Sequence, residues 1–105
     1  MTRLPIDDHH APLYSLGQVA DMLEVQQSFL RRLDEFEVVR PQRSSGGQRR
    51  YSRADINRVQ YVAELSGEGM TLVAIRRILE LEHQVKALKA ELAATRRLLP
   101  PATGD

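Results

Sequence analysis

The feature that most constrains the fold of this chain is a stripe of apolar side chains repeating every seven residues. From Ile78 onward the stripe advances in alternating steps of three and four residues, the a/d spacing of a coiled coil. Charged residues fill the other faces of this predicted helix, and Pro100-Pro101 terminates it. The seam consists of Ile78, Leu81, Val85, Leu88, Leu92, Thr95 and Leu99.

A single helix with this seam would leave its leucines in water, so a second helix is expected to cover it. We expect the cover to be a second copy of the chain, forming a homodimer. The alternative is that the seam packs on the rest of its own chain. That alternative is weaker because the remaining apolar pattern already ends near residue 80.

An arginine-rich segment at residues 43–51 is the second strong signal. Gly46 and Gly47 lie in its Ser-Ser-Gly-Gly centre and predict a tight hairpin that uses positive φ angles. Guanidinium groups bind phosphate oxygens well, often with two hydrogen bonds. The segment is therefore either a phosphate-binding hairpin or a solvated charged loop.

The charge distribution favours a polyanionic partner. Residues 26–58 contain eight arginines and four acidic residues, whereas the whole chain carries a net charge of +1. A local basic excess on an otherwise near-neutral chain is typical of a nucleic-acid-binding surface. The chain lacks cysteine, a membrane-length apolar run and a signal-peptide pattern, so we expect it in the cytoplasm.

The segments before residue 52 predict two helices and a hairpin. Ser15 and Gln18 form a capping box that starts a short helix, and a turn follows near residues 24–25. The second helix is expected over about residues 26–36, with Phe29, Leu30, Leu33 and Phe36 facing the first. Pro41 excludes helix at that point, so residues 38–51 are expected to form a two-stranded wing.

Two further helices follow the wing. Ser52 and Asp55 form a second capping box, which starts a helix that runs to Ser66. Residues 67–69 break that helix, and Thr71 caps the last one. Together the elements predict a mainly α fold, a winged helix-turn-helix with a small two-stranded wing and a long C-terminal coiled-coil dimerisation helix. The predicted division is a disordered tail at 1–12, a DNA-binding domain at 13–75, the dimerisation helix at 76–99 and a tail at 100–105.

No catalytic or metal-binding constellation is visible in the sequence. His83 lies in the predicted coiled coil without a partner, and no serine has the context of a nucleophile. Clustered metal ligands are absent as well. We therefore expect neither an enzyme nor a bound cofactor or metal.

The order of these parts resembles the MerR family of winged-helix transcriptional regulators. The matching motifs cover residues 13–80 and are Tyr-Ser-Leu-Gly-Gln-Val-Ala at 14–20, Leu-Arg at 30–31, Val-Val-Arg-Pro at 38–41, Gly-Gln-Arg-Arg-Tyr-Ser at 47–52, Asp-Ile at 55–56 and Gly-Met-Thr-Leu-Val-Ala-Ile at 69–75. Within the family, the wing, the Gly-Met-Thr-Leu segment and residues 78–82 are similar to the heat-shock repressor branch, HspR.

The resemblance implies which residues contact double-stranded DNA. Arg31 is expected on the DNA backbone from the second helix, and Arg49 and Tyr51 on phosphates from the wing, with Arg43 and Arg50 assisting. Tyr14 and Ser15 open the first helix near the backbone. The residues expected nearest to base edges are Gln26, Gln27, Ser28 and Arg32, because Gln suits adenine and Arg suits guanine.

The chain departs from the family pattern at several positions. Glu24 and Glu37 stand where the family usually has glycine, which bears on the geometry of two turns. Arg32 and Leu33 replace a common pair of tyrosines, and Gln48 replaces a frequent tyrosine or glycine. Members that sense metals or drugs have a large effector domain after the dimer helix, and this sequence has none.

The residues and the resemblance together predict a homodimeric, sequence-specific transcription regulator on a pseudo-palindromic operator, a repressor without a small-molecule ligand. The resemblance implies that an antiparallel coiled coil over residues 76–99 joins the two copies and that the protein is associated with the bacterial nucleoid. Regulation would come through a protein partner, abundance or temperature. Two alternatives remain. One is a protein-interaction adaptor on the same scaffold, similar to a chaperone modulator, and the other is an excisionase-type DNA architectural factor.

Overall fold

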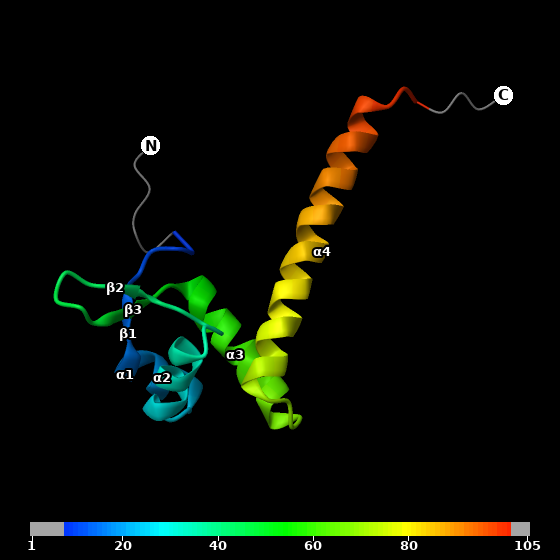
Figure 1. Ribbon diagram of the computed structural model, residues 1–105. Coiled ribbons are helices and arrows are strands. Elements are labelled where there is room, and N and C mark those ends of the chain that lie inside the picture. The colour runs from blue at the N-terminus through cyan, green and yellow to red at the C-terminus, as the bar shows by residue number, and fades with distance from the viewer. Residues whose placement is uncertain (1–7, 102–105) are drawn as a thin grey trace.

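The computed structural model describes residues 8–101 and confirms the predicted fold class (Figure 1). Two short helices and a wing are followed by a third helix, and a long fourth helix then leaves the globular part. The elements in chain order are β1 (Tyr14–Ser15), α1 (Leu16–Leu23), α2 (Gln27–Glu35), β2 (Gln42–Arg43), β3 (Arg49–Tyr51), α3 (Arg53–Gly67) and α4 (Leu72–Leu98).

The helix starts are set by local side-chain caps, as predicted. At α1 the Ser15 hydroxyl accepts from the backbone N–H of Gln18, and the Gln18 side chain accepts from the backbone N–H of Ser15. Ser52 and Asp55 make the same reciprocal pair at α3. Thr71 caps α4 through the N–H of Ala74. Each cap satisfies backbone donors that have no partner inside the helix.

Three helix ends share one backbone motif, in which a left-handed residue is followed by an N–H that reaches back five residues. After α1 the left-handed residue is Glu24 with φ 55°, after α2 it is Glu37 with φ 59°, and after α3 it is Gly69 with φ 95°. The reaching bonds are Val25 N–H to Ala20 O at 3.0 Å, Val38 N–H to Leu33 O at 2.8 Å and Met70 N–H to Leu65 O at 3.2 Å. Both glutamates at family glycine positions therefore adopt the glycine conformation.

The sheet has one strand more than predicted. Strand β3 pairs with β2 to form the wing, with Arg43 opposite Arg49, and it also pairs with β1, with Tyr14 opposite Tyr51. Residues 38–39 were expected to be extended, but they lie buried in the turn after α2, and the strand begins only at Gln42. At the wing tip only Gly47 of the two glycines has a positive φ, 81°.

The core lies between α1, α2, α3, the sheet and the first turns of α4. Its fully buried side chains include Val19, Leu30, Leu33, Val59 and Ile75. Phe36 was expected to pack on α1, but it is 42% exposed. The remaining buried apolar residues are Ala11, Ala20, Val38, Val39, Tyr51, Ile56, Val62, Leu65 and Leu72.

The N-terminal tail differs from the prediction over residues 8–12. This segment makes a turn, buries Ala11 and accepts a 3.0 Å hydrogen bond at His9 O from the N–H of Ala54 in α3. The rest of the predicted tail, residues 1–7, lies outside the described residues, as do residues 102–105.

Helix α4 is continuous across the predicted domain boundary between residues 75 and 76. Its first turns bury Leu72 and Ile75, and Ile78 and Leu79 pack partly against the core. Every residue from 81 to 98 is exposed, and this part of the helix projects away from the rest of the molecule (Figure 1). Leu99 ends the helix with extended backbone ahead of the two prolines.

Candidate nucleic-acid interface

A cationic groove lies where the wing meets the start of α1 and the side of α2. Five of the predicted DNA-binding residues line it: Ser15, Arg31, Arg43, Arg49 and Arg50. The structure therefore brings four arginines from three elements, α2, β2 and β3, onto one surface. The other lining residues of this surface, the wing groove, are Leu16, Gly17, Gly47 and Gln48.

The acidic side chain of Asp34 in α2 holds the wing arginines. One carboxylate oxygen of Asp34 accepts from Arg43 Nη2 and from Arg49 Nε, each at 2.8 Å, and Arg40 Nε lies 4.0 Å from the other oxygen. The Asp34 side chain is only 10% exposed. A carboxylate withdrawn from water and shared by arginines is a strong tether, so it fastens the wing to α2.

Arg31 and Arg50 complete the groove without a carboxylate partner among residues 8–101. Arg31 donates to Gln27 Oε1 of the same helix at 3.4 Å, and Arg50 donates to Gln48 Oε1 at 3.2 Å. Both contacts are to neutral amide oxygens, so both guanidinium charges are available to an anion. The N-terminus of α1, which carries a partial positive charge, opens at the same groove.

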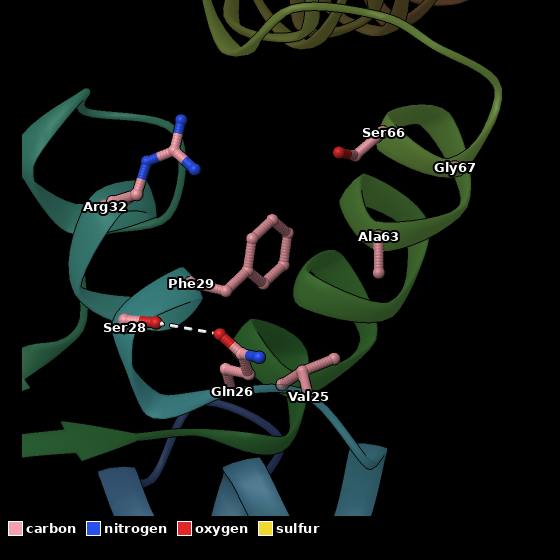
Figure 2. A pocket seen from close by; sticks show the side chains of 8 residues that line it. All are labelled: Val25, Gln26, Ser28, Phe29, Arg32, Ala63, Ser66 and Gly67. Atoms are coloured by element: carbon pink, nitrogen blue, oxygen red, sulfur yellow. Dashed lines mark hydrogen bonds between the residues drawn. The ribbon is translucent and has the colours of Figure 1, made fainter.

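Three of the four residues predicted to lie near base edges lie away from the wing groove, whereas the fourth, Gln27, accepts a hydrogen bond from Arg31. Gln26, Ser28 and Arg32 line a pocket between the start of α2 and the end of α3. Figure 2 shows Phe29 in the middle of this pocket, with α3 opposite it, and a hydrogen bond of 3.2 Å between Ser28 and Gln26. The two neighbouring arginines of α2 therefore diverge, with Arg31 on the wing groove and Arg32 on this pocket.

The two tyrosines of the predicted set do not lie on the wing groove. Tyr14 is half-buried in β1, and Tyr51 is 1% exposed, so Tyr51 is a core residue rather than the surface phosphate contact we expected. Its hydroxyl has no hydrogen-bond partner in the described part of the chain. Burial raises the pKa of Tyr51 to about 12, because the phenolate form would lose its hydration.

Asp34 and Gln48 belong to the interface but were not singled out from the sequence. Asp34 is 9 residues from Arg43 and 15 from Arg49, so only the folded chain brings the three together. Gln48 was noted only as a departure from the family pattern. The one local signal for Asp34 is its position three residues after Arg31 in the same helix.

Two classes of site can be assessed over the same residues. Residues 8–101 contain no group of three or more His, Asp or Glu side chains that could hold a metal ion. No helix in this range is long and apolar enough to cross a membrane.

Comparison with known proteins gives one family and several relatives. The family described as MerR HTH family regulatory protein matches residues 14–82. The chain is 40% identical over 83 residues to "Putative heat shock protein HspR" of Streptomyces coelicolor, which covers 78% of this chain and 55% of that protein. It is 28% identical over 86 residues to the HTH-type transcriptional regulator GlnR of Bacillus anthracis, covering 81% and 67%. The chain thus spans little more than half the length of its HspR relative.

Solved structures show the same architecture. The N-terminal part of the Bacillus subtilis multidrug transporter activator, MtaN, superposes with a TM-score of 0.59 at 27% identity, covering 83% of this chain and 99% of that one. HiNmlR, described as a MerR family regulator lacking the sensor domain and bound to promoter DNA, superposes with a TM-score of 0.59 at 23% identity. That pair covers 81% of this chain and 80% of the other.

Proposed function

The chain belongs to the MerR family of helix-turn-helix regulatory proteins, and from that premise we propose that it acts as a homodimeric repressor on a pseudo-palindromic operator. It is a DNA-binding transcriptional regulator and not an enzyme. The observation that carries the proposal is the wing groove, where four arginines and the N-terminus of α1 face one surface. Such a surface fits the phosphates of a DNA strand.

Within this interface the residues divide into two roles. Arg31 and Arg50 bind phosphate oxygens directly, since no carboxylate among the described residues occupies them. Arg43 and Arg49 position the wing through Asp34 and add their remaining N–H groups to the phosphate site. Phosphate contacts of this kind place the protein on the duplex without reading its sequence.

Sequence is read by the exposed N-terminal end of α2. Gln27 and Ser28 are exposed there, next to Gln26 and Arg32. An α-helix end carrying amide and guanidinium groups suits hydrogen bonds to adenine and guanine edges in the major groove. The wing then lies on the flanking backbone, which is compatible with bending of the DNA between half-sites.

The homodimer is supported by the exposed seam of α4. Leu81, Val85, Leu88 and Leu92 are between 43% and 62% exposed, in the part of α4 from residue 81 to 98 where every residue is exposed. Covering this stripe with a second α4 removes it from water. Occupation of an operator by such a dimer excludes other proteins from the same DNA, which is the simplest route to repression.

A second candidate, the protein-interaction adaptor, is favoured by one observation. The pocket of Figure 2 continues into a hollow lined by Phe29, Phe36, Met70 and Val73, in which Phe36 and Val73 are 42% and 59% exposed. Salt dependence separates the two candidates. Phosphate binding weakens steeply as salt rises, whereas an apolar contact changes little.

The test is selection from a random-sequence DNA pool at moderate salt, followed by affinity measurements on the enriched sequence. We expect an inverted repeat. Replacing Arg50 with alanine should then weaken binding by about 1–2 kcal/mol for every sequence alike. Arg97→Ala, on the exposed end of α4, is the matched control and should leave the affinity unchanged. Failure to enrich any sequence, or a change of base preference in Arg50→Ala, would contradict the proposal.

A further inference from the structure

The charged residues that flank the seam of α4 restrict how a second copy can align with it. With Ile78, Val85 and Leu92 at a positions and Leu81 and Leu88 at d positions, the e positions are Glu82, Lys89 and Arg96. The main g positions are Gln84 and Glu91. Residues at e and g border the covered stripe, so their charges decide which alignment is favourable.

We propose that, in the homodimer, the two α4 helices align with Val85 of one copy opposite the partner's Leu88, and that the partner's Arg96 binds carboxylates of Glu64 and Glu68 on α3. This inference rests on the proposed homodimer and adds its register and its second contact surface. The alignment of the two helices is thus determined by charged side chains on α3 and α4 that have no oppositely charged partner within the described part of a single chain.

The charge pattern selects this register among three antiparallel alignments that keep a positions opposite d positions. With Val85 opposite the partner's Leu88, each Glu82 lies beside a Lys89, and no like charges meet at the e and g positions. Moving the partner so that Val85 faces Thr95 sets Lys89 beside Lys89 and Glu91 beside Glu91. Moving it so that Val85 faces Leu81 sets Glu82 beside Glu82. Like charges at these positions destabilise the pair.

The same register satisfies the apolar seam. Leu81 then lies opposite Leu92, Val85 opposite Leu88, and Ile78 opposite Thr95, each twice because of the two-fold symmetry. The two central layers then pair Val85 with Leu88, and the layers on either side pair Leu81 with Leu92, so all four exposed apolar side chains are covered.

An acidic patch on α3 marks where the partner helix ends. The Tyr61 hydroxyl donates to Glu82 Oε1 at 2.6 Å, which joins α3 to the e side of α4. That hydrogen bond raises the pKa of Tyr61, and the carboxylates of Glu82, Glu68 and Glu64 raise it further. In the described chain neither Glu64 nor Glu68 has a basic partner within 4.0 Å.

The level of this patch matches the position of the partner's Arg96. Helix α4 runs back from the turn at 68–71 that ends α3 (Figure 1). The hydrogen bond from Tyr61 to Glu82 fixes which residues of the two helices lie level with each other. With equal rise per residue, Glu64 and Glu68 lie level with residues 75–79 of α4. In the Val85–Leu88 register the partner's Arg96 lies level with residue 77, on the e side, and therefore between the two carboxylates.

The cations concerned are free to make these contacts. Among residues 8–101, the ion pairs of α4 involve only Arg76, Arg77 and Glu80, at its base. Lys89 and Arg96 have no carboxylate within 4.0 Å, so a second copy supplies what they lack.

Disulfide trapping tests the register directly, because the sequence contains no cysteine. A mixture of Leu81→Cys and Leu92→Cys chains should give a covalent dimer on oxidation, and neither variant should do so alone. Cross-linking of Leu88→Cys with itself would show a parallel pair. Cross-linking of Leu81→Cys with Leu99→Cys, or with Val85→Cys, would show one of the two rejected registers. Each of these results would overturn the inference.

A charge-swap cycle tests the patch on α3. Arg96→Glu alone, and the Glu64→Lys/Glu68→Lys pair alone, should each raise the dimer dissociation constant roughly tenfold by sedimentation. Combining them should restore most of that loss, which a merely structural role of Glu64 and Glu68 would not do. Arg97→Glu, on the face opposite the seam, is the matched control and should have little effect. Absence of any restoration would overturn the patch contact.

These experiments distinguish failure of the proposed register from failure of the proposed homodimer. A wild-type chain that sediments as a monomer at every concentration removes the homodimer and with it the register. A stable dimer that traps at other cysteine pairs removes only the register and leaves the DNA-binding homodimer in place.

Discussion

The globular part of the chain is stabilised by contacts within the chain, whereas the far half of α4 has almost none. In the globular part, each of the helices α1, α3 and α4 starts at a side-chain cap, and α2 is tied to the wing through Asp34. From residue 81 to 98 all side chains are exposed, and among the described residues only the Tyr61–Glu82 hydrogen bond adds to the helix's own backbone bonds. The first region is therefore determined by its own sequence, whereas the second needs another chain.

The largest effect is expected when a charge is placed in the seam, because it should break the dimer and leave the globular part folded. Leu88→Lys places an ammonium group in the covered stripe of both copies and should raise the dimer dissociation constant roughly a hundredfold or more. The thermal unfolding of the globular part should change little. Sedimentation and circular dichroism measure the two quantities. Ala90→Lys, on the outer face of the same helix, is the control, and an intact Leu88→Lys dimer would show that the seam is misassigned.

A weaker but substantial effect on stability is expected from a substitution at Asp34, in the globular part. Asp34→Asn removes the charge shared by Arg43 and Arg49, and it should lower the free energy of unfolding by about 1–3 kcal/mol. Chemical denaturation measures this change. The neighbouring exposed Glu35→Gln should change it by no more than about 0.5 kcal/mol. Equal effects of the two variants would mean that the wing does not depend on Asp34.

A substitution at Tyr51 tests whether its buried hydroxyl group contributes to stability or to DNA binding. Tyr51→Phe removes a buried hydroxyl without a partner among residues 8–101, so it should stabilise the chain by up to about 1 kcal/mol at neutral pH. A loss of DNA affinity in this variant would instead restore the tyrosine as a phosphate contact.

The pH dependence of Tyr51 has a definite sign. Its folded pKa of about 12 exceeds the ordinary value of 10, so its contribution to stability is complete below pH 10 and is lost as pH rises through 12. Over that window the wild type should lose about 2–3 kcal/mol more than Tyr51→Phe, since each pH unit is worth about 1.4 kcal/mol. Parallel stability curves for the two proteins would contradict the burial of this hydroxyl.

The smallest predicted effect concerns the helix ends. Glu24→Gly relieves a left-handed φ of 55° but adds freedom to the unfolded chain, so a net gain of about 0.5 kcal/mol is expected. The reverse change, Gly69→Glu, should cost about 1 kcal/mol through conformation alone, because nothing lies within 4 Å of the position of its Cβ. Thermal denaturation of the two variants compares them, and a shift of the same sign in both would refute the shared helix-end motif.

The features that the sequence predicted correctly depend on residues that lie close together in the chain. The capping boxes at Ser15 and Ser52 are set by residues three apart, and the sequence was sufficient to identify both. The apolar stripe of α4 was identified in the same way, because a heptad repeat is a local pattern, and its role as a dimer seam stays a prediction. The hairpin at the wing was predicted from its glycines, although only Gly47 adopts the expected conformation.

What the sequence did not predict depends on contacts between distant segments. Strand β1 is two residues long, and its pairing with β3 joins Tyr14 to Tyr51 across the chain. The same pairing buries Tyr51, which by composition belonged with the wing arginines. Asp34 was missed for the same reason, since its arginines lie 9 and 15 residues away.

The carboxylate of Asp34 also makes this protein partly its own counterion. Arg43 and Arg49 stay bound to Asp34 and offer a phosphate only their remaining N–H groups, so the carboxylate cancels part of the positive charge that the phosphates meet. Fewer ions are then released on binding than there are arginines at the interface. The slope of log affinity against log salt concentration should therefore fall short of the value that four arginines would give, about 0.9 per phosphate neutralised, and Asp34→Asn should steepen it.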